Sequence, residues 1–419
     1  MYRVYLKVVF VFIPLDDHPK TGFARYFSNG FRPLFTACAI QAIVVMILWL
    51  IYLGRGGAVT PPGWSMIEWH GHELLFGFVG AAIGGFLLAA VSKWVGRPPV
   101  SGAPLVVLVL FWLAGRAVTW SGLDNLAALI VSNTGYWILL ACLVGREILA
   151  AGNRRNFVVL VMLLVMAGFS LAFQVGLVDR IHLLESQVLV IALMISLIGG
   201  RITPAFTRNW MMRRQPVSEH KPAQFGLWDK VAVGLSVLAT LAWVAQAPSM
   251  FSGGLLILAG ISQWVRLARW RGFASLSEPL LFALHLGYLW VGVGFVLLGL
   301  SAFVPALTVS AGIHALGVGA MGGMILAVAA RAALGHTNRE LKAGVIMSMS
   351  FLAIHLAALV RILAALIPNS AMMLLMLAGT LWVVAFVLFA ARYLPVLFGP
   401  EESLSEALKR EKGKVGVRS

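Results

Sequence analysis

Long apolar segments separated by short polar ones run through this chain of 419 residues. Bilayer hydrocarbon needs about 20 apolar residues per spanning helix, and most of the segments reach or approach that length. The pattern therefore predicts an all-α, polytopic membrane protein with about 12 transmembrane helices. The predicted spans are 34–53, 73–92, 103–120, 126–146, 156–178, 186–200, 228–246, 251–268, 279–300, 306–330, 343–366 and 371–394.

Basic residues are concentrated in alternate loops between these spans. If the amino terminus is inside, the cytoplasmic side receives Lys93 and Arg97, residues 201–230 and the basic tail, whereas the outer side keeps few arginines, such as Arg55 and Arg180. Cytoplasmic loops of membrane proteins carry an excess of Lys and Arg. The pattern therefore predicts a multi-pass protein with both termini in the cytoplasm.

The same pattern divides the chain into three parts. Residues 1–33 form a cytoplasmic N-terminal segment, 34–398 a single 12-helix transmembrane domain, and 399–419 a cytoplasmic basic tail. The loop 201–230 lies at the midpoint of the domain. Residues 4–13 are apolar but too short to span, which indicates an interfacial segment.

Composition excludes a soluble protein, because 60% of the residues are hydrophobic, 11% are charged and the mean hydropathy is +0.91. The net charge of +16 is spread over short loops, so we expect membrane lipids and no nucleic acid as partners. Cys38 and Cys142 fall within spans, where we interpret both as small core residues.

Histidines within the spans are the main candidates for chemistry, because a polar side chain in the membrane costs free energy unless a partner or cofactor satisfies it. His70 and His72 stand at the outer start of the second span. Two positions along a helix are about 200° apart, so both could bind one metal only if His70 lies in a non-helical start of the span. The alternatives are metal ligation and an interfacial anchor pair.

Glycines follow His314 in the tenth span, at Gly317, Gly319, Gly322 and Gly323. Glycine costs a helix about 0.8 to 1.0 kcal/mol per residue, so such a run needs a reason. Either a neighbouring helix or a flat bulky group, such as a porphyrin, lies close to it.

His285 and His355 lie within the ninth and eleventh spans, where each is either a metal ligand or a buried histidine bonded to a neighbouring helix. Carboxylates such as Glu73, Glu147 and Glu185 only border the predicted spans. This distribution argues against a buried proton path.

Glycine pairs suggest an internal repeat, since spans two, six and ten all run inward and carry Gly84-Gly85, Gly199-Gly200 and Gly322-Gly323. Three sets of four helices fit this spacing. The alternative is that the pairs only allow close packing of helices, as small residues commonly do in membranes.

Seven blocks spread over nearly the whole chain resemble the NnrS family, in the order of that family. They are residues 29–35 (NGFRPLF), 69–78 (WHGHELLFGF), 96–99 (GRPP), 199–207 (GGRITPAFT), 285–290 (HLGYLW), 314–324 (HALGVGAMGGM) and 334–337 (LGHT). The resemblance implies a bacterial inner-membrane protein with haem, expected to be of the b type, and copper. It further implies a role in nitric oxide handling during denitrification or nitrosative stress.

Twelve spans and an inside amino terminus also resemble the catalytic subunit of haem-copper oxidases and nitric oxide reductases. There, spans two and ten supply the axial histidines of a haem in the outer half of the membrane. The resemblance implies His72 and His314 as haem ligands, with His70, His355 and His285 as further metal candidates. Span six has no histidine and no adjacent His-His pair occurs, so the three-histidine copper centre of those enzymes is not reproduced.

Arg361 is the most attractive partner for haem propionates on the outer side, and an arginine that reaches the interface is the alternative. Two functions remain open. One is a protein that binds or processes nitric oxide or a related small gas; if it is an enzyme, it is an oxidoreductase supplied with electrons by a partner protein or quinol. The other is a metal or haem transporter, or a nitric oxide sensor without turnover. No catalytic residue is predicted.

Overall fold

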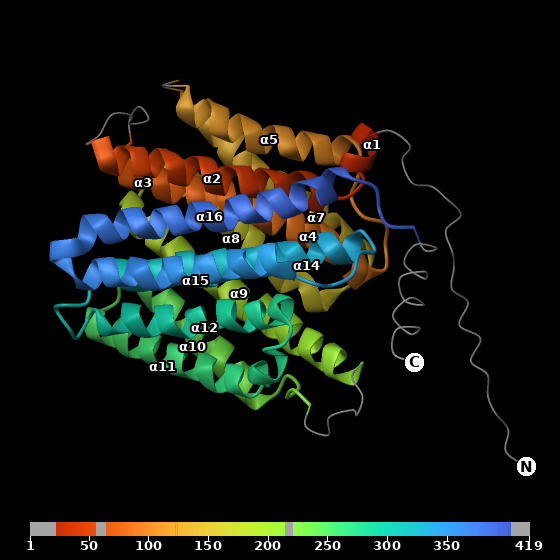
Figure 1. Cartoon of the computed structure of the whole chain (residues 1–419). Coiled ribbons are helices and arrows are strands. Elements are labelled where there is room, and N and C mark those ends of the chain that lie inside the picture. The colour runs from red at the N-terminus through yellow and green to blue at the C-terminus, as the bar shows by residue number, and fades with distance from the viewer. Residues whose placement is uncertain (1–21, 56–63, 122, 124, 214–220, 404–419) are drawn as a thin grey trace, which may run out of the picture.

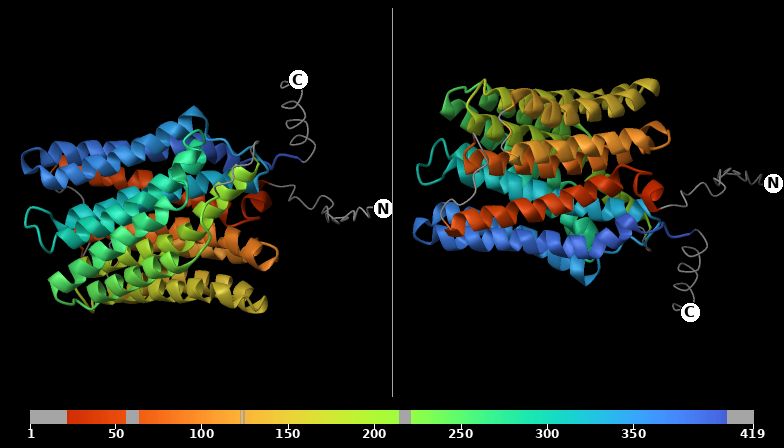
Figure 2. Two further views of the ribbon diagram at one scale, coloured as in Figure 1. Left: turned by 90° about the horizontal axis from the view of Figure 1, so that it is seen from below. Right: turned by 90° about the horizontal axis from the view of Figure 1, so that it is seen from above.

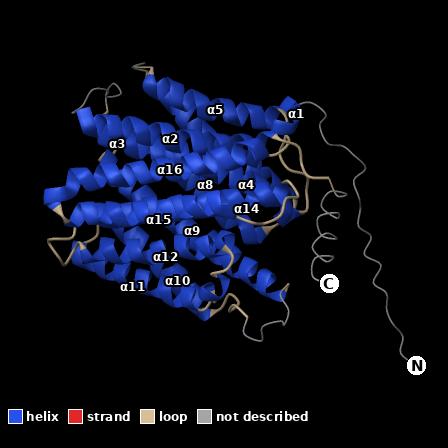
Figure 3. Ribbon diagram, in the orientation of Figure 1, coloured by secondary structure: helices blue, strands red, loops and turns tan. Residues whose placement is uncertain are grey.

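A computed structural model describes residues 22–55, 64–121, 123, 125–213 and 221–403. The predicted interfacial segment 4–13 and most of the predicted tail lie outside these ranges. The described chain is all-helical and contains 12 helices that are long and apolar enough to cross a membrane (Figure 3). The prediction of a polytopic all-α protein with 12 spans is confirmed.

Each span consists of one helix or of consecutive helical pieces. The pieces are α1 (Gly22–Tyr26), α2 (Phe31–Arg55), α3 (Met66–His72), η1 (Glu73–Val79), α4 (Gly80–Val95), α5 (Ala103–Trp120), α6 (Leu126–Leu129), η2 (Ile130–Thr134), α7 (Gly135–Ala150), η3 (Arg154–Asn156), α8 (Phe157–Val175), α9 (Arg180–Met212), α10 (Leu227–Val244), α11 (Ser249–Ala268), η4 (Gly272–Ser275), α12 (Pro279–Leu300), α13 (Val309–His314), η5 (Ala315–Gly322), α14 (Gly323–His336), α15 (Gly344–Leu366), η6 (Pro368–Ser370) and α16 (Ala371–Phe398).

The helices lie side by side in a bundle (Figures 1 and 2), and Figure 1 shows α5 at one edge and α10 and α11 at the other. Burial separates inner from outer spans. In the span Met66–Val95, 78% of the most apolar window is buried within the protein, against 28% in Ala103–Trp120. The spans that carry His70, His72, His285 and His314 therefore lie inside the bundle, whereas α5 mainly faces outward and the span of His355 is only 39% buried.

The first and last spans close the bundle, because α2 packs along α16. Arg32 has no exposed surface and donates hydrogen bonds to the carbonyl oxygens of Leu397 and Gly399, each at 2.8 Å. Next to it, the ring of Tyr26 stacks on that of Phe398. The two ends of the described chain thus meet at one end of the bundle, as an even number of spans requires.

Two spans contain a π-helix at the same place relative to a histidine. The π-helix η1 begins directly after His72 and η5 directly after His314, and each returns to an α-helix at a glycine, Gly80 or Gly323. Such π-helical turns occur frequently at functional sites. A third π-helix, η2, interrupts the fourth span, whereas α9 in the sixth span has none. The threefold repeat therefore stays a prediction.

The predicted loop 201–230 is shorter than its charges suggested. Helix α9 continues through Arg201 to Met212 with Pro204 inside it, and α10 begins at Leu227. A helix of 33 residues is about 50 Å long, whereas the hydrocarbon core is about 30 Å thick. The inner end of α9 can therefore project beyond the hydrocarbon, where its arginines are solvated without ending the helix.

Candidate functional site

A cavity of about 420 Å³ lies between the helices at the end of the bundle away from Tyr26 and Phe398. We call it the outer cavity, following the orientation that the positive-inside rule predicts. Three of the predicted site residues, His70, His314 and Arg361, line it together. They come from three different spans, so only the tertiary fold brings them to one place.

His314 is held in a defined protonation state by its neighbours. Its Nδ1 is 2.8 Å from the carbonyl oxygen of Ser310, which can only accept, so Nδ1 carries the proton. Its Nε2 is 3.2 Å from an Arg361 nitrogen, which can only donate. Nε2 is therefore the unprotonated nitrogen, and its lone pair accepts the hydrogen bond from Arg361. The same arginine nitrogen donates to the Ser310 hydroxyl at 2.8 Å, which ties the three side chains together.

His70 reaches the outer cavity from α3 and stacks on the indole of Trp49, with ring centroids 4.2 Å apart. Its Nδ1 is buried and has no hydrogen-bond partner among the residues that the structure describes. Arg361 and His314 are close enough to interact electrostatically with it. A buried imidazole without a partner is costly, and a ligand in the cavity would relieve that cost.

His70 and His72 do not share a site, because both lie within the helix α3. The non-helical start at His70 that a shared metal would require does not form: Ser65 caps the helix and forms a capping box with Glu68, so α3 begins at Met66. Two residues apart on a helix, the side chains point to nearly opposite faces. His70 faces the outer cavity, and His72 does not line it.

His72 belongs to a second, largely buried polar cluster. Its Nδ1 is 2.9 Å from Glu73, and its Nε2 is 3.1 Å from the amide nitrogen of Gln174. Glu73 also pairs with Arg116 at 2.8 Å and accepts a hydrogen bond from Gln41 at 2.7 Å. Both ring nitrogens of His72 thus have protein partners. The pairing of His72 with His314 stays a prediction, and the contacts favour His70 for that place.

His285 and His355 lie apart from the outer cavity. Nε2 of His285 is 2.9 Å from the hydroxyl of Thr207 on α9. His355 accepts a hydrogen bond at Nδ1 from the indole of Trp290, at 3.0 Å, which leaves its proton on Nε2. Each histidine is bonded to a neighbouring helix, which was the alternative that the sequence left open.

The glycines after His314 have two different roles. A Cβ at Gly319 would collide with the ring of Trp290, one at Gly322 would lie 2.9 Å from Trp382, and one at Gly323 would lie 2.8 Å from His355. These three glycines therefore allow neighbouring side chains to approach. Gly317 has nothing within 4 Å of that position and lines the outer cavity.

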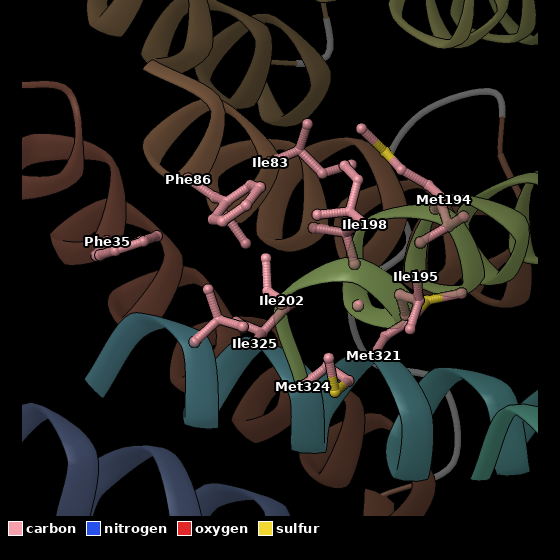
Figure 4. A pocket seen from close by; sticks show the side chains of 15 residues that line it. Phe35, Ile83, Phe86, Met194, Ile195, Ile198, Ile202, Met321, Met324 and Ile325 are labelled. Carbon is pink, nitrogen blue, oxygen red and sulfur yellow. The ribbon is translucent and has the colours of Figure 1, made fainter. Parts of the chain in front are cut away.

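Two further cavities continue from the outer one toward the other end of the bundle. A middle cavity of about 90 Å³, with an apolar lining from α2, α4, α9, η5 and α14, shares Val79 and Met321 with the outer cavity (Figure 4). An inner cavity of about 320 Å³ shares Phe86, Ile202 and Val328 with the middle one. The three cavities follow one another along the bundle.

Several residues of the two clusters are not among the candidates that the sequence indicated. Ser310 stands four residues before His314, the spacing at which a helical side chain meets a backbone carbonyl. Gln41 and Gln174 are polar residues within spans, and this alone marks them as candidates for buried contacts. Trp49 gives no such signal, because aromatic residues are common in membrane helices.

Comparison with protein families matches residues 25–401 to the family described as NnrS protein. A comparison with curated proteins finds no match. The family match covers nearly all of the described chain, including every residue of the outer cavity and of the Glu73 cluster. This chain therefore belongs to the NnrS family, and it is a membrane protein linked to the response to nitric oxide.

Proposed function

We propose that the chain binds a haem in the outer cavity through His314, with His70 beside it, and that nitric oxide binds there. One observation carries the proposal: His314 donates Nδ1–H to a backbone carbonyl and keeps Nε2 unprotonated, with its lone pair turned toward Arg361, in a cavity that His70 also lines. Histidines that ligate metals almost always donate their other ring nitrogen in this way. The match to a family linked to nitric oxide supports the choice of ligand.

The residues present fit a haem in three respects. A volume of about 420 Å³ lies within the range of about 300 to 1,000 Å³ common for small-molecule sites. The walls are mostly apolar, with Leu74, Phe78 and Trp382 among them, as a porphyrin face requires. Arg361 supplies the cation that haem propionates need, and it does so from within the cavity rather than at the membrane surface.

Copper fits less well than haem. The described residues contain no group of three or more His, Cys, Asp and Glu side chains that could hold a metal ion. His70 and His314 supply two imidazoles, which suit copper, but a copper site usually needs a third ligand. We therefore propose haem for the outer cavity. Copper binding stays a prediction, which the copper content of the purified protein would test.

Reduced haem iron would supply the nitric oxide binding itself. The chain contributes apolar walls that admit a small neutral gas. It also contributes the Arg361 guanidinium, a positive charge beside His314 that would pair with the haem propionates. Glu185 also lines the cavity and is a carboxylate there that could carry a proton. Whether nitric oxide is reduced depends on an electron donor, for which a quinol or a partner protein is the expected class.

Transport is the second candidate, and the succession of three cavities favours it. They share residues from one to the next, and α4, α9 and α14 with its preceding π-helix border more than one of them. A transporter needs polar sites separated by a constriction that opens and closes. The apolar middle cavity, which is the smallest of the three, corresponds to such a constriction (Figure 4).

Optical spectra of the purified protein test the haem proposal. We expect haem absorption bands that shift when nitric oxide is added to the reduced protein, with iron found by mass spectrometry on the same sample. His314→Ala should lose most of the bound haem, and His70→Ala should lose haem or change its spectrum, because each removes an imidazole from the outer cavity.

His355→Ala is the matched control, since it removes a buried histidine that lies outside the outer cavity. It should leave the spectrum and the nitric oxide shift unchanged. His72→Ala separates the two assignments: loss of haem there, with His70→Ala unaffected, would return the ligand role to His72. Colourless wild-type protein without iron would overturn the haem proposal and favour transport.

A further inference from the structure

The inner cavity has a basic rim and no acidic lining. Lys93 at the end of α4, together with Arg331 and His336 on α14, lines it, and none of its lining residues is Asp or Glu. Lys93 is close enough to His336 to act on it electrostatically, and Arg331 lines the same cavity. Like charges gathered around a cavity favour an anion within it.

Arg331 lies against an aromatic ring in the wall of the cavity. Its guanidinium lies over the ring of Phe206, 4.1 Å from the centroid, and this ring is also part of the cavity lining. Glu278, which does not line the cavity, attracts the positive charge of Arg331, and Arg213 repels it. An arginine stacked on an aromatic ring keeps its hydrogen-bond donors for a planar or tetrahedral oxyanion.

The rest of the lining is apolar and extends toward the middle of the bundle. Trp94, Val328 and Leu341 line the same cavity, and the shared residue Phe86 continues into the apolar middle cavity. Apolar walls of this kind do not stabilise a free inorganic anion. A molecule with an anionic head and an apolar body matches both parts of the lining.

We infer that the inner cavity binds the phosphate head group of an anionic phospholipid from the cytoplasmic leaflet, between α4, α9 and α14. Basic pockets between helices on the cytoplasmic side are a known setting for anionic head groups, each Lys or Arg near the surface contributing about a fivefold gain in affinity. The inference does not depend on haem or nitric oxide, since it rests on residues at the opposite end of the bundle.

Native mass spectrometry of the full-length protein in detergent tests the inference. The probes are phosphatidylglycerol and phosphatidylcholine with identical acyl chains. We expect phosphatidylglycerol to remain bound more strongly, and Arg331→Gln and Lys93→Gln each to weaken its binding by about fivefold. Arg392→Gln is the matched control, because Arg392 is an exposed arginine near the inner end of α16 and lies outside the cavity.

A second variant removes space instead of charge. A Cβ at Gly335, which lines the inner cavity, would meet only Leu341, at 3.9 Å, so Gly335→Leu can extend into the cavity without displacing the backbone. This variant should lose phosphatidylglycerol binding although every basic residue is retained. A melting temperature equal to that of the wild type shows that the loss is local.

Competition with excess inorganic phosphate distinguishes a site that binds free phosphate from one that binds only the phosphate of a lipid head group. Displacement of the lipid by phosphate supports an oxyanion site that also accepts free phosphate. Failure to displace it supports a site that needs the acyl chains as well. Equal binding of both lipids, or equal losses in Arg331→Gln and Arg392→Gln, would overturn the inference, because general attraction to a basic surface would then account for the result.

Discussion

Glu73 is a carboxylate without exposed surface in a membrane-spanning helix. From the sequence it borders the predicted span 73–92, but the helix begins seven residues earlier, at Met66. Glu73 therefore lies about 10 Å along the helix from its start. Arg116, His72 and Gln41 satisfy it there. The interpretation that this carboxylate only edges the membrane is wrong, because the start of a helix depends on a cap that hydropathy does not detect.

Removal of the Glu73 charge tests what this buried cluster contributes. We expect Glu73→Gln to destabilise the protein by about 3 to 5 kcal/mol, because the Arg116 charge would lose its partner in a buried setting. The melting temperature in detergent measures the effect. The double variant Glu73→Gln/Arg116→Met should recover part of the loss.

Glu340→Gln is the control, since it breaks an ion pair with a lysine that is 69% exposed. An exposed ion pair contributes about 0 to 1 kcal/mol to the free energy of unfolding, so the melting temperature of this variant should barely change. If both single variants melt alike, the Glu73 cluster does not stabilise the fold through its charges.

At the scale of the elements, the packing of the tenth span against its neighbours depends on glycines at defined positions. The sequence showed that a run of glycines needs a close neighbour but left two neighbours open, a helix or a flat group. The structure assigns three of the four glycines to side chains of α12, α15 and α16, and Gly317 to the outer cavity. The sequence could not separate them, because the direction of each residue depends on the π-helix η5.

Alanine at single glycines tests this division. Gly319→Ala should lower the melting temperature, because the new methyl group would collide with the ring of Trp290. Gly317→Ala should leave stability unchanged or raise it, since its methyl group meets no neighbour and alanine favours helices by about 1 kcal/mol. Equal losses in the two variants would contradict the assignment. If Gly317→Ala also alters the haem spectrum, the cavity has lost space that the cofactor needs.

At the scale of the whole molecule, the predicted orientation remains to be measured. Green fluorescent protein fused at the carboxyl terminus should fluoresce, because it folds in the cytoplasm. Alkaline phosphatase inserted between α12 and α13, near residue 305, should be active, since this loop lies at the end of the bundle away from Phe398. The reverse pattern would mean that the outer cavity faces the cytoplasm.

Hydropathy and charge predicted the number of spans, because each span must satisfy the bilayer almost independently of the others. They did not predict which spans meet. His70, His314 and Arg361 are distributed over more than 290 residues, and their shared cavity follows from the packing of the second, tenth and eleventh spans. The sequence therefore named these three residues as candidates without placing them together. It could not choose His70 over His72, because that choice depends on where α3 begins.

The hydrogen bond between Arg32 and Leu397 can form only late in the synthesis of the chain. Arg32 is translated 365 residues before Leu397, whose carbonyl oxygen accepts one of its hydrogen bonds. At about 5 to 20 residues per second, a ribosome needs on the order of 20 to 70 s to cover that interval. During this time α2 is in the membrane without α16 beside it, and the guanidinium must be held by water, lipid phosphate or the insertion machinery. The bundle is therefore completed only when its last helix has been made.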